Sequence, residues 1–436
     1  MMPWFSNTTF STALDKIGFI LTVIVVMACS INKPVLNIAG AMLLLVFILY
    51  VIQQPDYLKK ALHHPMVLGC LIWLSWLALT ILYASNRLDA LYAFKGYNWL
   101  LYPLVFFPFL YQQHHRIRIA LGAFIGMIAV FLIAIYANRF ILPHEWNIIL
   151  QSGGVAPVPA IHFNTAVIFM LLIVASYSLL PYAKAYWQQG LLLLMGLSAL
   201  LAEVAINTSR MGYVTEIILI FIILVSRWRL KGLGLFIVIA GIGLTSLNYL
   251  SHTFSHRVTQ GTNQVTQYYN AWTTNDHQAM KHVARTSVGS RLLHLDIMSQ
   301  NMPHESLWRN LFGFGISADN YKQQFYRFIE RYPKDSIYYG VQPAYGGPDN
   351  NYLRSWVTTG LLGVALMVAL LMTWLHIARY LPSPYQQIGR CGLLIFALGS
   401  AFANPLMNLQ IRTMWVPVFL CFMMWPYPSL MPNKTK

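Results

Sequence analysis

VLNIAGAMLLLVFILYVI, residues 35–52, carries no charged side chain. A helix needs roughly 20 predominantly apolar residues to cross the hydrocarbon of a bilayer, and this stretch is close to that length. No water reaches hydrocarbon, so the backbone there must form its hydrogen bonds internally, which a helix does within a single segment. The stretch therefore predicts a transmembrane helix.

The same pattern recurs along the 436-residue chain, in which 57% of the residues are hydrophobic and 10% are charged. A soluble domain carries about a quarter charged residues. The composition predicts an all-α integral membrane protein with about 12 transmembrane helices. The apolar stretches behind this count are 17–31, 35–52, 66–84, 97–111, 117–136, 162–180, 190–206, 211–226, 233–250, 351–375, 388–403 and 411–425.

The distribution of basic residues orients the chain. With the N-terminus inside, the inner segments hold 13 Lys and Arg and the short outer loops hold 6. Cytoplasmic segments carry such an excess, so both termini are expected in the cytoplasm. Residues 251–350 then form a large, mainly helical outer loop domain, with short helices near 276–300 and 317–332. Transmembrane helices occupy residues 1–250 before it and 351–436 after it.

The net charge of +16 does not indicate nucleic-acid binding, because the basic residues are scattered between apolar stretches. They fit positive-inside topology and contact with membrane lipids. The four cysteines lie in apolar stretches without metal-ligand spacing. The chain also has no P-loop, dinucleotide fingerprint or His-Glu-x-x-His motif. We expect no metal and no cofactor.

Three polar segments are candidates for chemistry, and the first is Asn207-Thr208-Ser209-Arg210. It places an arginine where the outer end of one predicted helix meets the start of the next. Such an arginine either snorkels to lipid headgroups or binds an anion such as a lipid phosphate. The anion site is plausible because the guanidinium fork matches phosphate oxygens. The local sequence leaves both interpretations open.

The second segment, Ser287-Val-Gly-Ser-Arg291, lies early in the outer loop. Ser287 or Ser290 is expected to cap a following helix, which would aim backbone N–H groups and Arg291 at one point. This arrangement predicts a second phosphate site. The alternative is an ordinary solvated helix.

The third segment, Asp349-Asn350-Asn351-Tyr352, opens a long apolar helix. An aspartate at this place is most often an N-cap. Alternatively, Asp349 is a carboxylate held at the membrane surface as a base or substrate anchor. Asn350 and Tyr352 are then expected to contact substrate.

Together these features resemble the O-antigen ligase and polymerase superfamily of bacterial membrane glycosyltransferases. Arg210 after its Thr/Ser turn and Arg291 in its Gly-Ser-x-Arg-like segment resemble two arginines of that family. Its most specific motif is His-Asn, nine residues, then Gly-x-x-Gly. Asn350 and Gly360-Leu-Leu-Gly363 keep this spacing, while Asp349 replaces the histidine. An aspartate, with an ordinary pKa of about 3.9, is a weaker base than histidine but still orients a hydroxyl.

The resemblance implies a GT-C-like fold in the bacterial inner membrane, with an active site that faces the periplasm. The implied donor is a glycan on undecaprenyl pyrophosphate, and the acceptor is lipid A-core. Arg210 and Arg291 would stabilise the charge that develops on the leaving pyrophosphate, and Asp349 would orient the attacking hydroxyl. Lys95 and Arg412 would extend the anion site.

Three alternatives remain open. An O-antigen polymerase or a protein O-oligosaccharyltransferase of the same superfamily would use the same kind of donor. A lipid-linked glycan transporter would more often carry ionisable residues within its spans, where Glu203 and Glu216 are the main candidates. Both glutamates are close in sequence to Arg210, which favours a surface site over a conduit.

Overall fold

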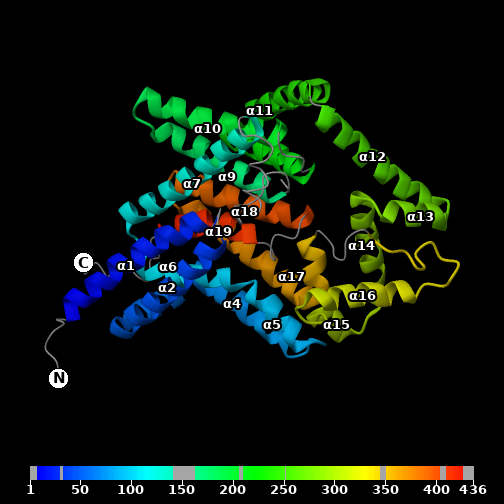
Figure 1. The fold of residues 1–436 in the computed structure, drawn as a ribbon, viewed down its shortest axis with the longest axis horizontal. Coiled ribbons are helices and arrows are strands. Elements are labelled where there is room, and N and C mark those ends of the chain that lie inside the picture. The colour runs from blue at the N-terminus through cyan, green and yellow to red at the C-terminus, as the bar shows by residue number, and fades with distance from the viewer. Residues whose placement is uncertain are drawn as a thin grey trace.

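The computed structural model describes residues 7–29, 33–140, 163–205, 210–250, 252–343, 350–402 and 409–425, and every regular element in them is a helix (Figure 1). In chain order these are α1 (Asn7–Ala28), α2 (Lys33–Gln53), α3 (Pro55–His63), α4 (Pro65–Ile81), α5 (Arg87–Lys95), α6 (Tyr102–Leu110), α7 (His114–Phe140), α9 (Phe163–Leu179), α10 (Tyr186–Ala205), α11 (Arg210–Leu250), α12 (His252–Thr273), α13 (His277–Ala284), α14 (Ser287–Asn301), α15 (Leu307–Phe312), α16 (Ala318–Glu330), α17 (Asn351–Ile377), α18 (Tyr385–Phe402) and α19 (Leu409–Phe422). Short 3-10 helices are η1 (Asn98–Leu101), η2 (Leu180–Tyr182), η3 (Met302–His304) and η4 (Ala378–Tyr380).

Within the described ranges, 4 helices are long and apolar enough to cross a membrane, or 5 if the bent pair α3–α4 is one span. Shorter apolar helices cover Asn98–Leu110, Phe169–Tyr182, Tyr186–Ala202 and Glu216–Val225. The prediction of an all-helical protein with membrane-spanning helices is therefore confirmed. The count of about 12 spans and the GT-C-like assignment stay predictions.

The outer surface of the bundle is apolar. On α2, the side chains of Ile38, Leu45 and Ile52 are 63%, 60% and 71% exposed. Soluble monomers rarely expose a continuous apolar surface of this kind. Lipid contact explains it, because lipid tails solvate such side chains as well as a protein core does.

Two local features differ from the predicted layout, and a third agrees with it. The predicted inner loop before α4 contains α3, which meets α4 at 83°. The predicted outer loop after α4 contains α5, whose first turn is capped by Asn86 accepting the backbone N–H of Asp89 (3.2 Å). Finally, α11 is broken at Arg229, where φ is 49°. This break separates the two stretches that were expected as separate spans.

The predicted outer loop, for short the outer loop below, forms helices α12–α16 to the right of the bundle in Figure 1. The helices expected near 276–300 and 317–332 are confirmed as α13 with α14 and as α16. These helices enclose a second hydrophobic core, separate from that of the bundle. Leu353 and Val357, from the first turns of α17, also belong to this core. The N-terminal part of α17 is thus packed into the loop.

Candidate functional site

The helices that carry most of the predicted site residues are linked by contacts with α17 and α18. Arg210 begins α11, Arg291 lies in the second turn of α14, Asn350 caps α17 and Arg412 lies in α19. Helix α18 contacts α11, α17 and α19, and α14 contacts α17. Helices α17 and α18 therefore connect α11, α14 and α19.

The remaining predicted residues have different positions. Lys95 is exposed at the end of α5, and that helix contacts α4 and α16. Asp349 lies outside the described residues, as do the side chains of Arg210, Arg412 and Glu203. Their assigned roles stay predictions.

Asn350 is the N-cap of α17. Its Oδ1 accepts the backbone N–H of Leu353 (2.9 Å), which satisfies one of the free donors of the first turn. Its Nδ2 donates to the backbone carbonyl of Ala401 in α18 (2.8 Å). The capping role considered for Asp349 is therefore filled by Asn350.

The next two residues also tie α17 to α18. The Tyr352 hydroxyl donates to the carbonyl of Ala397 (2.9 Å). Nδ2 of Asn351 lies 3.3 Å from Oγ of Ser400, and Asn351 is buried. The start of α17 is thus positioned by side-chain bonds to one neighbouring helix. Substrate contact by Asn350 and Tyr352 stays a prediction.

The Gly-x-x-Gly segment coincides with a break in α17. Gly360 has φ 74° and ψ 179°, a conformation that is essentially restricted to glycine. A Cβ at Gly360 would lie 2.1 Å from the carbonyl oxygen of Leu311 at the end of α15. Glycine is therefore required here for the backbone conformation and for the close approach of α15.

The outer loop supplies partners for the carbonyl groups that this break exposes. The backbone N–H of Phe314 donates to the carbonyl of Val357, and that of Gly315 donates to the carbonyl of Thr358, both at 2.9 Å. A buried helix break without such partners would leave costly unpaired carbonyls. The loop and the broken helix therefore complete each other.

The same loop segment also binds α4 and α5. The Tyr83 hydroxyl donates to the carbonyl of Phe312 (2.5 Å), and the Ser317 hydroxyl donates to the carboxylate of Asp89. These contacts fix residues 312–317 against the bundle.

Helix α14 starts differently from the prediction. Thr286 is its N-cap and accepts the backbone N–H of Gly289 (3.1 Å). The expectation that Ser287 or Ser290 caps this helix is therefore wrong. Thr286 precedes both serines, Ser287 is already helical, and Ser290 is fully buried.

The first turn of α14 also has fewer open donors than a phosphate cradle requires. Gln264 of α12 accepts the backbone N–H of Val288 (3.3 Å), and that of Gly289 is already bonded to the cap. A Cβ at Gly289 would lie 2.1 Å from the carbonyl oxygen of Val283. The glycine of the Gly-Ser-x-Arg-like segment thus serves close packing. Arg291 itself is half-buried in the next turn.

Residues 190–368 match the family model described as O-antigen ligase. This part of the chain is similar to the O-antigen ligase family. The resemblance inferred from the sequence is therefore confirmed. No curated protein matches the chain.

The O-antigen ligase match runs from α10 to the middle of α17. It includes both predicted arginines, Arg210 and Arg291, and both glycines of the helix break. Members of this family are membrane glycosyltransferase-like enzymes.

Within the segment that matches the O-antigen ligase family, Arg354 is a candidate that sequence reasoning missed. It lies four residues after Asn350, and its backbone N–H donates to the carbonyl of Asn350 (3.0 Å). The carboxylate of Asp89 provides an opposite charge in the surroundings of Arg354. Its position in the first turn of a predicted membrane span was the available signal, because ionisable residues there are rare and usually functional.

A cavity of about 550 Å³ lies at the opposite end of α17 from this motif. It is lined by His376, Arg379 and Arg390, among others. It is therefore separate from the candidate site of the matched segment.

Proposed function

We propose that this protein is an O-antigen ligase of the bacterial inner membrane. It transfers a glycan from undecaprenyl pyrophosphate to a sugar hydroxyl of lipid A-core, on the periplasmic side, in lipopolysaccharide assembly. The family match over residues 190–368 carries this proposal. That segment holds the two predicted phosphate-binding arginines, the Asp349 motif and the broken helix that receives the outer loop.

In the proposed reaction, the acceptor hydroxyl oxygen attacks the anomeric carbon of the donor. The bond from that carbon to the pyrophosphate oxygen breaks, and undecaprenyl pyrophosphate leaves. Arg210 and Arg291 stabilise the negative charge that grows on the leaving group. Asp349 orients the hydroxyl and accepts its proton. Lys95 and Arg412 add positive charge near the leaving group. Neither metal nor nucleotide is needed, because the pyrophosphate linkage is already activated.

Arg354 is added to this machinery as a positioning residue. It follows the motif by one helical turn, and Ser317 of the loop bonds the carboxylate of Asp89, with which Arg354 interacts. In the proposal, Arg354 sets the orientation of the Asp349 segment relative to the loop. The arrangement suits a GT-C-like enzyme whose lipid substrate enters from the side of the helix bundle.

The test uses purified protein reconstituted with a glycan on undecaprenyl pyrophosphate and with lipid A-core, without nucleotide or metal. Glycan on lipid A-core is the expected product. Longer lipid-linked glycan would instead indicate an O-antigen polymerase. Transfer to a co-purified or added protein would indicate a protein O-oligosaccharyltransferase. Passage of donor across the membrane without transfer would indicate a transporter.

The same assay tests the assigned residues. Arg210→Ala and Arg291→Ala are each expected to lower transfer by about two orders of magnitude or more, the usual effect of losing a transition-state charge partner. Asp349→Asn should lower transfer while membrane insertion is kept. Lys322→Ala is the control, because Lys322 is exposed on α16. Near-normal transfer by both arginine variants would contradict the phosphate-site assignment.

A further inference from the structure

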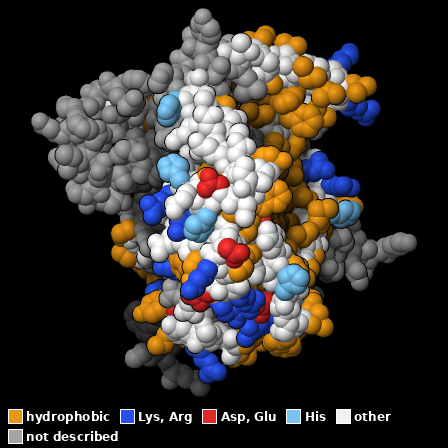
Figure 2. Space-filling view, turned by 90° about the vertical axis from the view of Figure 1, so that its right-hand side faces the viewer, with side chains coloured by type: hydrophobic (Ala, Val, Ile, Leu, Met, Phe, Trp, Pro, Cys, Tyr) orange, Lys and Arg blue, Asp and Glu red, His pale blue; other side chains and the backbone are white. Residues whose placement is uncertain are grey.

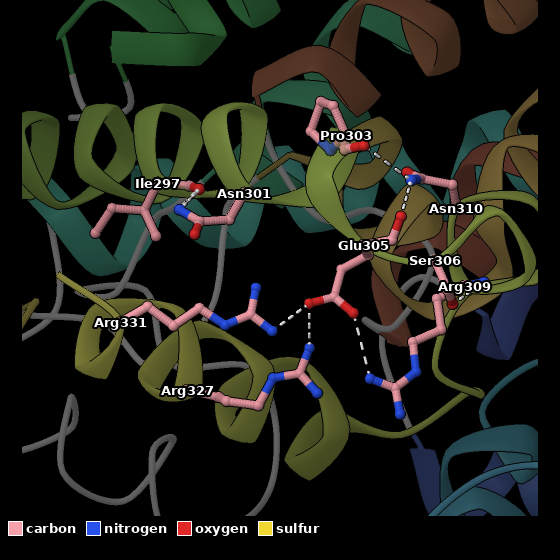
Figure 3. Close-up of polar contacts among 9 residues, drawn as sticks. All are labelled: Ile297, Asn301, Pro303, Glu305, Ser306, Arg309, Asn310, Arg327 and Arg331. Carbon is pink, nitrogen blue, oxygen red and sulfur yellow. Dashed lines mark hydrogen bonds and ion pairs between the residues drawn. The ribbon is translucent and has the colours of Figure 1, made fainter.

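Three arginines of the outer loop surround one buried carboxylate (Figure 3). Oε1 of Glu305 accepts hydrogen bonds from Arg327 of α16 and from Arg331 just after it, each at 2.5 Å. Oε2 accepts one from Arg309 of α15 at 3.2 Å. The Glu305 side chain is only 5% exposed. We call these four residues the Glu305 cluster.

The Glu305 cluster has more positive charge than its carboxylate compensates. Each guanidinium has five N–H donors, and only one donor of each is bonded to Glu305. No other carboxylate of the described chain pairs with these arginines. In addition, the buried Nε of Arg327 has no acceptor among the described residues. Burial lowers the pKa of Arg327; Glu305 opposes this effect and Arg331 adds to it.

Aromatic rings hold these guanidiniums in place. The ring centroid of Phe314 lies 5.1 Å from the guanidinium carbon of Arg309 and 5.1 Å from that of Arg327. The ring centroid of Phe328 lies 5.3 Å from the guanidinium carbon of Arg327 and 5.0 Å from that of Arg331. Cation–π contact at these distances is favourable and restricts the side chains. The three arginine side chains nevertheless remain 33–45% exposed. A ligand can therefore reach positive groups that are already positioned.

Lys, Arg and acidic side chains lie side by side on the lower part of the loop face (Figure 2). A network that served stability alone would need one or two cations for one carboxylate. A third cation adds repulsion without an acceptor. The Glu305 cluster therefore has room for a further anion, which would balance its excess positive charge.

We propose that Arg309, Arg327 and Arg331 bind a phosphate group, with Glu305 holding the three guanidiniums around it. A phosphate monoester carries close to two negative charges at neutral pH and three acceptor oxygens. It therefore matches both the two uncompensated charges and the unused N–H donors. Phe314 donates its backbone N–H to Val357 of α17. Phe314, which packs on two of the arginines, is thus hydrogen-bonded to the broken helix. The phosphate site is distinct from the predicted pyrophosphate site at Arg210 and Arg291.

The test measures binding of inorganic phosphate to the full-length protein in phosphatidylcholine nanodiscs, by thermal unfolding at constant ionic strength. Phosphate should raise the unfolding temperature of the wild-type protein. Arg331→Gln should weaken phosphate binding about tenfold or more, because it removes a charged hydrogen-bond donor, while Glu305 keeps two cations. Lys322→Gln removes one charge from the same helix and should leave binding unchanged.

Two results would overturn the proposal: no response to phosphate by the wild-type protein, or an equal response by Arg331→Gln. If Arg331→Gln does not fold, Arg309→Gln provides the same comparison. Arg291→Gln should retain the response, because the site does not depend on the proposed catalytic arginines. Loss of the response in Arg291→Gln alone would place the bound phosphate at the donor site and also overturn the proposal.

Two further arms identify the source of the phosphate. Glucose 6-phosphate represents a phosphorylated sugar, and nanodiscs that contain phosphatidic acid represent a lipid headgroup with a phosphate monoester. An Arg331-dependent response to either ligand supports the phosphate site and assigns its source. If neither ligand gives a response, the proposal that the site binds the phosphate of a sugar or a lipid is wrong.

Discussion

Glu305 shows how one residue organises its surroundings. Burial of its carboxylate opposes ionisation, but the guanidiniums of Arg331, Arg327 and Arg309 outweigh this effect, and the pKa of Glu305 lies below its ordinary value of 4.5. A carboxyl whose pKa is lower in the folded state stabilises the fold above its unfolded-state pKa. This contribution is lost as the pH falls from 4.5 through the folded-state pKa.

We therefore expect the stabilisation by Glu305 to be fully present, and independent of pH, near neutrality, and the unfolding temperature to fall on acidification below 4.5. Glu305→Gln should destabilise the fold at neutral pH by about 1–3 kcal/mol, because charged hydrogen bonds are lost, and should reduce the acid dependence. Thermal unfolding as a function of pH measures both effects. Glu330→Gln, on the exposed side of α16, is the matched control. An unchanged acid profile in Glu305→Gln would contradict this assignment.

The break in α17 determines how this helix joins the outer loop. Gly360→Ala should prevent the approach of α15, since the added Cβ would lie 2.1 Å from a carbonyl oxygen. Gly340→Ala is the matched control. Gly340 also has a positive φ (66°), but no atom lies within 4 Å of its added Cβ.

Backbone strain of about 1–3 kcal/mol is expected in both glycine variants. Only Gly360→Ala should also expose the loop, which limited proteolysis of residues 307–317 would detect as faster cleavage. Equal cleavage rates in the two variants would show that α15 does not depend on the break.

The long apolar helices were predicted better from the sequence than the short connections and caps between them. Apolar stretches such as 35–52 give helices because the pattern is local and the bilayer leaves few alternatives. The helices α3 and α5 were missed because they lie in short polar connections, although Asn86 followed by Asp89 was a capping signal. The cap of α14 is Thr286, one residue before Ser287 and four before Ser290, the two predicted caps.

The candidate site was predictable only in part, for a physical reason. Arg291 was selected because it lies in a Gly-Ser-x-Arg-like segment, and its role also stays a prediction. Arg354 and Glu305 owe their environments to contacts between segments far apart in the chain, such as Arg327 with Glu305. No local pattern encodes those contacts. The assignments of Arg210 and Asp349 stay predictions.

At the scale of the whole molecule, the predicted orientation has a direct test. The four native cysteines are all buried, so an introduced cysteine can be labelled in the natural background. In intact cells, a membrane-impermeant maleimide should label Lys334→Cys in the outer loop and not Lys184→Cys in a predicted inner segment. Both lysines are exposed. Labelling at position 184 without labelling at 334 would reverse the proposed topology.

The shared core of the outer loop and α17 has a consequence for exchanging parts between related proteins. Leu353 and Val357 are on a membrane helix, yet they are buried with the loop side chains. A graft that replaced only residues 251–350 would leave these two residues in a foreign interior. The segment that must be exchanged as a whole therefore extends through Gly360. Chimaeras joined after Gly360 should fold, whereas those joined at residue 350 should not.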